Sequence, residues 1–265
     1  MITVDDVSRF LDAFAPLRLA EPWDNVGLLL GDRQRSADRI MTCLTITGAT
    51  AAEAVRHQAQ LVVVHHPLPF AALKRLTTDS PEGRSLWSLA GAGISIFSPH
   101  TAFDSAPEGI NQRLAAGLGL AEIEPLTTRL EDVDGRRLGA GRRGQFSQPL
   151  PLAEVVERVK KFLGVERVQI VGAPRTNVSK IAVGCGSAGD LLADARRAGC
   201  ECFVTGETRF HTALEAEAAG LAMILTGHYA SERFAVEFLA ELLAREFPAA
   251  YVWASADERD PLVWG

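Results

Sequence analysis

Residues 40–66, IMTCLTITGATAAEAVRHQAQLVVVHH, contain the pattern that decides the fold class. Two apolar runs, Ile40–Ile46 and Leu61–Val64, predict strands, and the stretch Thr50–Gln60 between them predicts a helix. A third apolar run, Ile94–Phe97, follows a further helical stretch. Continuous apolar runs separated by helices are typical of strands buried on both faces of a sheet. The sequence therefore predicts an α/β fold with mainly parallel sheets.

The same order of elements returns in the second half of the chain. The expected strands and helices there are, in order, Lys180–Val183, Ser187–Ala198, Cys202–Thr205, Thr208–Ala219 and Ala222–Leu225. Ile181 follows Ile40 by 141 residues, and Glu207 follows His66 by the same 141. A shared order of elements at a fixed offset indicates two similar α/β halves.

The predicted domain boundaries follow from this repeat. Residues 1–124 are expected to form the first half and residues 125–227 the second. Residues 228–265 are expected to form a C-terminal helix and tail that pack back on the first half. Residues 125–150 are rich in Gly, Arg and Pro, and predict a turn, a short antiparallel strand and a loop before an amphipathic helix at Leu152–Leu163.

The charge balance of the chain bears on its partners. The 265 residues include 27 Lys and Arg against 33 Asp and Glu, so the formal net charge is −6. A general nucleic-acid surface requires the opposite balance, which makes nucleic acid an unlikely partner. One cluster of basic residues stands out, and we interpret it as a solvated loop: Arg136, Arg137, Arg142 and Arg143.

Other features of the sequence indicate a soluble, cytoplasmic protein without a membrane partner. No apolar run approaches the roughly 18 to 20 residues that a membrane helix needs. The first residues, MITVDDVSRFLDAFAP, have the spacing of an amphipathic helix rather than a signal peptide. The cysteines have no CxxC spacing, so we expect buried, reduced thiols at Cys43, Cys185, Cys200 and Cys202.

Five of the six histidines lie where an expected strand ends or an expected helix begins. His65 and His66 follow one strand, whereas His100 and His228 each follow another strand. Polar residues at the carboxyl ends of parallel strands meet at one edge of a sheet. The sixth histidine, His57, lies within an expected helix, and we interpret it as structural.

The spacing of these side chains favours metal binding. Adjacent side chains on an extended backbone diverge, so His65 and His66 suit two neighbouring ions better than one. Asp104 lies four residues after His100, and Glu232 lies four residues after His228, so each carboxylate can bridge two metals. Imidazole and carboxylate donors suit zinc, iron, manganese or nickel without selecting among them.

Two glycine patterns have the spacing of phosphate-binding turns. The run Gly139–Gly144 fits GxGxxG, but no buried strand precedes it. The run Gly184–Gly189 lies between an expected strand and helix, with Glu207 beyond the next strand, which resembles a dinucleotide fingerprint. A tight strand-to-helix turn is the favoured interpretation, although a phosphate at this turn is physically reasonable.

Six motifs, taken in order, resemble the GTP cyclohydrolase 1 type 2 homologue family, which is also described as dinuclear-metal-centre hexameric proteins. They are EPWDNVGLLLGD (21–32), VVVHHPLPF (62–70), SPHTAFDSAPEGIN (98–111), GCGSAG (184–189), TGETRFH (205–211) and TGHYASE (226–232). The motifs span nearly the whole chain, whose length is similar to that of the short form of the family.

The resemblance implies a specific site and assembly. It implies a pair of divalent ions, zinc, iron or manganese, in the cleft between the two halves of each subunit of a toroidal homohexamer. The implied metal ligands are His65, His66, Asp104, His228 and Glu232.

The resemblance also implies residues around the ions. His100, Glu207 and His211 would contact the ligands or face the substrate, and His100 and Glu207 are the candidate catalytic residues. The run Trp23-Asp24-Asn25 would shape the mouth of the site or form a structural turn. Thr45 stands where members of the family often carry an Asp, which affects expected substrate contacts rather than the ligands.

Two classes of function remain open at this point. One is a dinuclear-metal-dependent hydrolase, GTP cyclohydrolase-like, that acts on a nucleotide or small polar substrate through a metal-bridging hydroxide. The other is a non-catalytic metal-binding or regulatory ring. A ring that encircles DNA is disfavoured by the net charge, and a dinucleotide-dependent oxidoreductase leaves the histidines unexplained.

Overall fold

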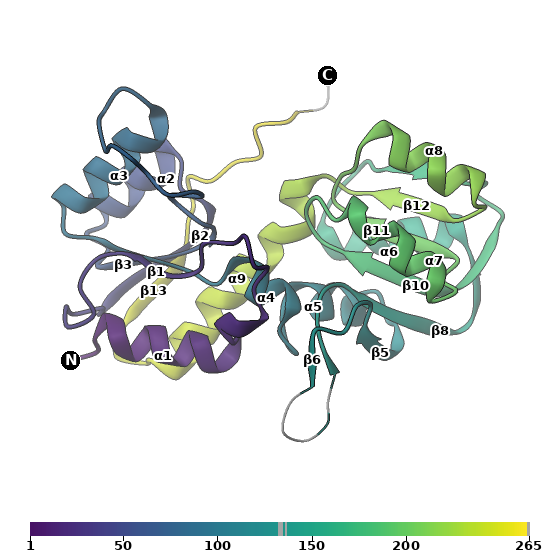
Figure 1. Cartoon of the computed structure of the whole chain (residues 1–265), viewed down its shortest axis with the longest axis horizontal. Helices are drawn as coiled ribbons and strands as arrows, with labels where there is room; N and C mark the ends of the chain where they lie inside the picture. Colours follow the sequence, from purple (N-terminus) through teal and green to yellow (C-terminus); the bar gives the residue numbers. More distant parts are fainter. Residues whose placement is uncertain (132–134, 136, 264–265) are drawn as a thin grey trace. The chain divides into compact units, whose positions relative to one another are not determined.

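The computed structural model describes residues 1–131, 135 and 137–263, and the chain divides into two compact units. The first unit comprises Met1–Phe103 and Ala235–Gly265, and the second comprises Asp104–Phe234 (Figure 1). The second unit is therefore inserted within the sequence of the first.

The first unit is built on a five-stranded sheet with the order β1-β4-β3-β2-β13. Neighbouring strands run parallel, except that β1 is antiparallel to β4. The strands span Gly27–Leu30 (β1), Arg39–Thr45 (β2), Leu61–His66 (β3), Ser95–Ser98 (β4) and Tyr251–Ala254 (β13).

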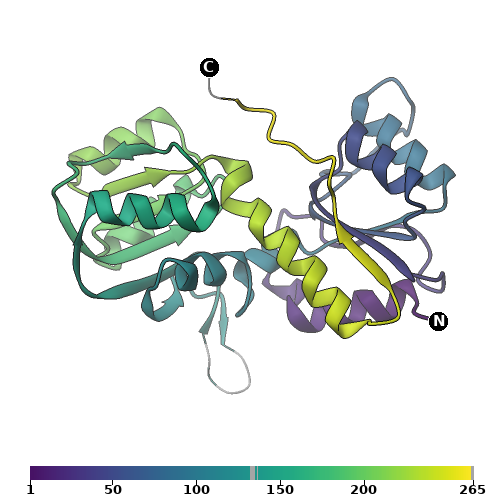
Figure 2. The same cartoon turned by 180° about the vertical axis from the view of Figure 1, so that it is seen from behind.

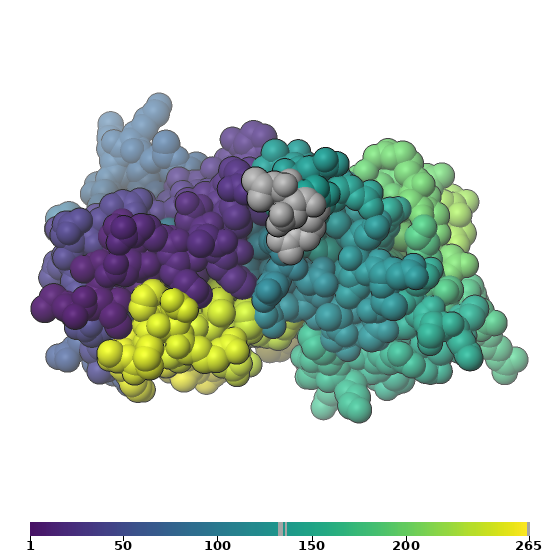
Figure 3. Space-filling model, turned by 90° about the horizontal axis from the view of Figure 1, so that it is seen from below, coloured from purple at the N-terminus to yellow at the C-terminus, as the bar shows by residue number. Residues whose placement is uncertain are grey.

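Helices cover both faces of this sheet (Figure 1). The helices are α1 (Val4–Phe14), the short 3-10 helix η1 (Leu17–Leu19), α2 (Gly48–Arg56), α3 (Pro81–Gly91), α4 (His100–Ser105) and α9 (His228–Glu246). Helices α2 and α3 pack on one face over an apolar core that includes Met41 and Val62. On the other face, the ring of Phe10 in α1 contacts the ring of Phe247, which directly follows α9, with centroids 5.6 Å apart. Figure 3 shows this packing of the first residues (purple) against the last (yellow).

The second unit contains a six-stranded mixed sheet with the order β5-β8-β10-β11-β12-β9. Its strands span Ala121–Pro125 (β5), Arg142–Pro151 (β8), Gln169–Val171 (β9), Asn177–Gly184 (β10), Cys202–Thr205 (β11) and Ala222–Leu225 (β12). A separate small pair consists of β6 (Leu130–Glu131) and β7 (Arg137–Leu138).

The helices of the second unit also lie on both faces of its sheet. They are α5 (Ile110–Gly117), α6 (Leu152–Leu163), the 3-10 helix η2 (Gly189–Leu191), α7 (Leu192–Arg197) and α8 (Phe210–Ala218). Helices α7 and α8 bury Ala195 and Ala216 against Phe203 of β11. Helix α6 lies over the other face, as Figure 2 shows from behind.

The two sheets share a topology. In the first, the three parallel strands β2, β3 and β4 are followed by β1, which precedes them in the chain and runs antiparallel to β4. In the second, β10, β11 and β12 are followed by β9, which likewise precedes them and runs antiparallel to β12. The predicted α/β fold with two similar halves is therefore confirmed.

The two units have other boundaries than those predicted from the sequence repeat, which were 124/125 and 227/228. Asp104, α5 and β5 lie in the second unit, where β5 pairs with β8, whereas the predicted first half, 1–124, included Asp104, α5 and all of β5 except Pro125. Helix α9 changes unit at Ala235 rather than at residue 228. The expected short antiparallel strand is the ten-residue β8, and the expected C-terminal tail includes β13, which pairs with β2.

The basic cluster is solvated only in part, which corrects the interpretation above for Arg142. Arg142 is 2% exposed, and its side chain donates to backbone carbonyls and to Gln112 Oε1. Arg137 and Arg143 each form an ion pair of 2.7 Å with Glu124. Arg136 lies outside the described residues.

Two further expectations concern membranes and thiols. Among the described residues, no helix is long and apolar enough to cross a membrane. All four cysteines are buried, as expected, and the described residues contain no disulfide.

The C-terminal segment is fixed to α2 by a buried carboxylate. Glu53 is 2% exposed and accepts hydrogen bonds from Trp253 Nε1, Ser255 Oγ and the backbone N–H groups of Ala256 and Asp257. Burial by itself raises the pKa of Glu53, but these four donors outweigh burial and hold that pKa below 4.5.

Glu53→Gln is therefore expected to destabilise the first unit by about 2 to 3 kcal/mol at pH 7, because an amide offers an N–H where Asp257 already donates. A carboxylate with a lowered folded pKa stabilises the protein above its unfolded pKa, and loses that effect as the pH falls through the folded value. The difference from the parent should therefore be full above about pH 5 and shrink below 4.5. Urea unfolding followed by tryptophan fluorescence measures it, because Trp23, Trp87 and Trp253 all belong to the first unit.

The matched control is Glu241→Gln, on the exposed side of α9, which should change the free energy of unfolding by less than about 0.5 kcal/mol. A Glu53→Gln deficit of equal size at pH 3 and pH 7 would contradict the assignment.

Candidate metal centre

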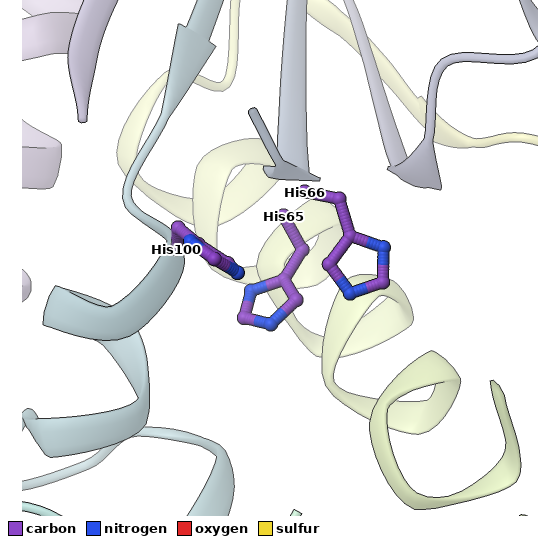
Figure 4. A group of neighbouring side chains, drawn as sticks. All are labelled: His65, His66 and His100. Carbon is purple, nitrogen blue, oxygen red and sulfur yellow. The ribbon is translucent and has the colours of Figure 1, made fainter. Parts of the chain in front are cut away.

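Three histidines of the first unit converge at the carboxyl end of β3. His65 and His66 end that strand, and His100 begins α4 directly after β4 (Figure 4). One ring nitrogen from each of the three lies within 4.8 Å of the others, which is close enough for a shared ion. His65 is almost fully buried, whereas His66 and His100 are partly exposed. The sequence placed these residues at one sheet edge, and the structure groups them there.

His100 is held by Asp24, which lies 76 positions earlier in the chain. Asp24 Oδ1 is 2.7 Å from His100 Nδ1, and Oδ2 accepts from the backbone N–H and hydroxyl of Thr101. Burial raises the pKa of Asp24, but the bonds from His100 and Thr101 outweigh it, so the net pKa is lowered and the carboxylate stays ionised. A proton on Nδ1 leaves the lone pair on Nε2, which is the arrangement found in metal-binding histidines.

His66 is held in the same way by a hydroxyl. Thr45 Oγ1 lies 2.7 Å from His66 Nδ1, across the parallel pair β2 and β3. The end of β2 is itself fixed by Glu258, whose carboxylate accepts the backbone N–H groups of Leu44 and Thr45 at 2.9 and 2.7 Å. Thr45, noted above as a departure from the family, therefore contacts a predicted ligand directly.

The second unit contains its own group of donors at the start of α9. His228 Nε2 lies 3.1 Å from Glu232 Oε2, one helical turn later, and His228 Nδ1 lies 2.9 Å from Glu207 Oε1. The hydrogen bond to Glu232 is the largest cause that raises the pKa of His228 to about 9, with Glu207 adding to it against burial. Two carboxylates around one imidazole make this group a site for positive charge.

Asp104 and Glu232 also share surroundings in the second unit. Burial raises the pKa of the Cys185 thiol far above its usual value, and the negative charges of Glu232 and Asp104 raise it further. The same Asp104 charge favours the cationic form of Arg142, whose pKa burial lowers to about 10. Both predicted carboxylate ligands therefore lie near Cys185.

The Gly184–Gly189 turn owes its glycines to packing around this group. A Cβ on Gly186, whose φ is +64°, would lie 2.2 Å from Glu232 Oε1. The Gly186 N–H donates to Ser231 Oγ on α9, and the Gly186 carbonyl accepts from the Glu207 N–H. The turn is followed by a 3-10 turn, and α7 begins only at Leu192. This geometry favours the tight-turn interpretation over a dinucleotide site.

The remaining candidates lie outside these two groups. His211 is exposed on α8, where its ring lies against Phe210. His57 follows the last residue of α2 rather than lying within a helix, and its ring lies 5.9 Å from that of Trp253, which fits a structural role. The sequence did not point to Glu258, because no local motif surrounds it. It did point to Asp24, within the motif 21–32, but not to the contact between Asp24 and His100.

Comparisons with known proteins agree with the six motifs. A family model described as Duf34/NIF3 (NGG1p interacting factor 3) matches residues 2–261. A protein of Clostridium acetobutylicum named GTP cyclohydrolase 1 type 2 homolog is 31% identical over 231 residues, covering 87% of this chain and 85% of the relative. Protein NIF3 homolog of Schizosaccharomyces pombe is 34% identical over 259 residues, covering 92% of each. The resemblance drawn from the motifs is confirmed.

Solved structures show the same fold. A Bacillus cereus protein related to NIF3 aligns with a TM-score of 0.91 at 21% identity, covering 100% of this chain and 99% of that one. A hypothetical protein of Staphylococcus aureus aligns with a TM-score of 0.89 at 25% identity, covering 99% of both.

Proposed function

Since the chain belongs to the Duf34/NIF3 family, we propose that it is a metal-dependent hydrolase that acts on a nucleotide or a similar small polar molecule. In this proposal His65, His66, Asp104, His228 and Glu232 hold two divalent ions. The convergence of the His65, His66 and His100 nitrogens within 4.8 Å is the observation that supports it most.

The chemistry of the donors fits such ions. Divalent zinc, iron and manganese take four to six donors and accept imidazole nitrogen and carboxylate oxygen. The first unit supplies imidazole nitrogens, and the second supplies an imidazole with two carboxylates around it. Thr45 contacts Nδ1 of His66, and Asp24 contacts Nδ1 of His100. In each ring, Nε2 therefore points away from that partner.

The chain's own residues suit a hydrolytic reaction. A bound divalent ion would supply a Lewis acid that polarises a substrate oxygen and acidifies water. His100, with Asp24 on Nδ1, can accept a proton at Nε2 and return it to the leaving group. Glu207, half exposed beside His228, can hold a second proton.

Turnover under defined metal conditions tests the proposal. The parent is incubated with GTP and other nucleotides, with and without added zinc, manganese or iron, and products are separated by chromatography. We expect metal-dependent turnover that falls by about 100-fold or more in His100→Gln or Glu207→Gln, with His57→Gln as the unaffected control. Bound metal without turnover of any nucleotide would instead support the non-catalytic metal-binding or regulatory alternative.

The assembly is part of the same proposal. We propose the homohexamer that the family resemblance implies, and light scattering coupled to size-exclusion chromatography measures the subunit number. A monomer at micromolar concentration would contradict it.

Thr45→Ala is expected to weaken metal binding without removing a ligand, because it releases the His66 ring from the hydroxyl that fixes its orientation. Loss of such a partner costs about 10- to 100-fold in metal affinity, measured by competition with a chelating dye. Asp24→Asn releases His100, the proposed proton carrier, so it should lower turnover and leave the metal affinity nearly unchanged. Thr78→Ala, in an exposed loop, is the control, and an unchanged affinity in Thr45→Ala would contradict the orienting role.

A further inference from the structure

Two large aromatic side chains lie exposed beside the histidine group of the first unit. Trp23 is 61% exposed and Phe70 is 56% exposed, and their ring centroids lie 5.9 Å apart. Each ring also meets His100 at a steep angle, with centroids 6.1 Å away for Trp23 and 6.3 Å away for Phe70. His100 in turn lies 5.1 Å from the His65 ring. The aromatic pair therefore borders the proposed metal donors.

The positions of both rings are fixed by the residues that follow Trp23. Asp24 binds His100, as described above, and Asn25 Nδ2 donates to the carbonyl of Pro69 at 2.8 Å, next to Phe70. The run 23–25 thus orients a candidate donor, anchors the loop after β3 and presents an indole to solvent. Exposed aromatic surface that is held in place beside polar donors is typical of a ligand-binding site.

We propose that Trp23 and Phe70 form a stacking platform for a planar heteroaromatic ring of the ligand. Aromatic rings bind planar heterocycles through offset or tilted contacts with centroids 4.5 to 7 Å apart. Trp23 and Phe70 both contact His100. A ligand ring that stacks on these two side chains therefore lies beside His100, with its polar substituents near the histidine group. This proposal rests on the proposed function in one respect, that the ligand is a substrate of a metal-dependent hydrolase. Binding of the ring can be measured without that assumption.

The surface of the first unit also supplies a matched comparison. Trp87 is 59% exposed, close to the value for Trp23, but it lies on α3, whereas the histidine group lies on β3 and α4. A general effect of losing exposed indole would therefore be equal in Trp23→Ala and Trp87→Ala.

The experiment compares ligands that differ only in the ring. GMP, AMP and nicotinamide mononucleotide each carry a planar ring on ribose 5-phosphate, and ribose 5-phosphate itself carries none. Calorimetry and quenching of tryptophan fluorescence measure their binding to the parent and to Trp23→Ala, Trp23→Phe, Phe70→Ala and Trp87→Ala. The metal content and subunit number of each preparation are measured in parallel.

We expect at least one ring-bearing probe to bind more tightly than ribose 5-phosphate and to quench the parent's fluorescence. That advantage should fall about tenfold to a hundredfold in Trp23→Ala and Phe70→Ala, be retained largely in Trp23→Phe, and be unchanged in Trp87→Ala. Equal binding of all four probes, or equal losses in Trp23→Ala and Trp87→Ala, would overturn the platform.

Two further outcomes separate the platform from its premises. Ring binding in a parent that takes up no metal would support the platform and reject the metal-dependent hydrolase. A lower subunit number in Trp23→Ala, with no ring preference in the parent, would overturn the platform and assign the aromatic pair to a contact between copies.

Discussion

Replacing His65 with alanine is expected to lower the affinity for metal by at least about 100-fold, so that protein purified without added metal contains far less than the two ions per chain proposed for the parent. His65 is 1% exposed and shares its group with His66 and His100, so no mobile surface residue can replace its nitrogen. Glu232→Ala should have a similar effect, because it removes a buried carboxylate that lies 3.1 Å from His228 Nε2. Mass spectrometry of the elements measures the metal content.

His57→Ala is the control for a lost imidazole, because His57 is exposed at the end of α2. Since His65→Ala also opens a buried space, His65→Gln serves as a second variant that fills it. Circular dichroism should show both variants folded. Unchanged metal content in folded His65→Ala and His65→Gln would reject the first group as a metal site.

Arg142→Met is expected to destabilise the second unit by about 3 to 5 kcal/mol. The guanidinium is buried and donates to the carbonyls of Gly139, Gly141 and Ala106 and to Gln112 Oε1. Methionine fills much of the volume but removes all of these donors, so the Ala106 and Gly141 carbonyls keep only their backbone hydrogen bonds from Gly109 and Leu126. Thermal unfolding by circular dichroism and hydrogen exchange of amides in 104–234 measure the loss.

Arg143→Met provides the comparison at the next position. Arg143 is 28% exposed and pairs with Glu124, a partly exposed carboxylate that Arg137 also contacts. Such a pair contributes about 0 to 1 kcal/mol. Equal destabilisation by Arg142→Met and Arg143→Met would contradict the structural role assigned to Arg142.

The sequence predicts well the elements that have a strong local pattern. The strands β11 and β12 and helix α6 lie at the predicted residues, because each is a continuous apolar run or an amphipathic repeat. Strand β8 has Gly, Gln and Pro where a buried strand usually has branched residues, and it forms because two neighbours, β5 and β10, pair with it. Strand β13 likewise depends on β2, which lies more than two hundred residues earlier.

The candidate site divides in the same way. The histidines and carboxylates are visible in the sequence because they follow strands at repeated positions. Their partners are not, because Asp24 meets His100 across 76 positions and Glu258 meets Thr45 across 213. Such contacts arise from the packing of distant elements and leave no spacing that a single sequence reveals.

The insertion of the second unit within the first has a consequence for how the protein is made. A ribosome completes residues 104–234 as one uninterrupted segment, so this unit can fold as soon as it has left the exit tunnel. The first unit must wait, because its sheet lacks β13 and Glu53 lacks its partners until 251–257 have been synthesised. The usual order of N-terminal folding before C-terminal folding is thus reversed, and the edge of β2 stays unpaired by β13 during that interval.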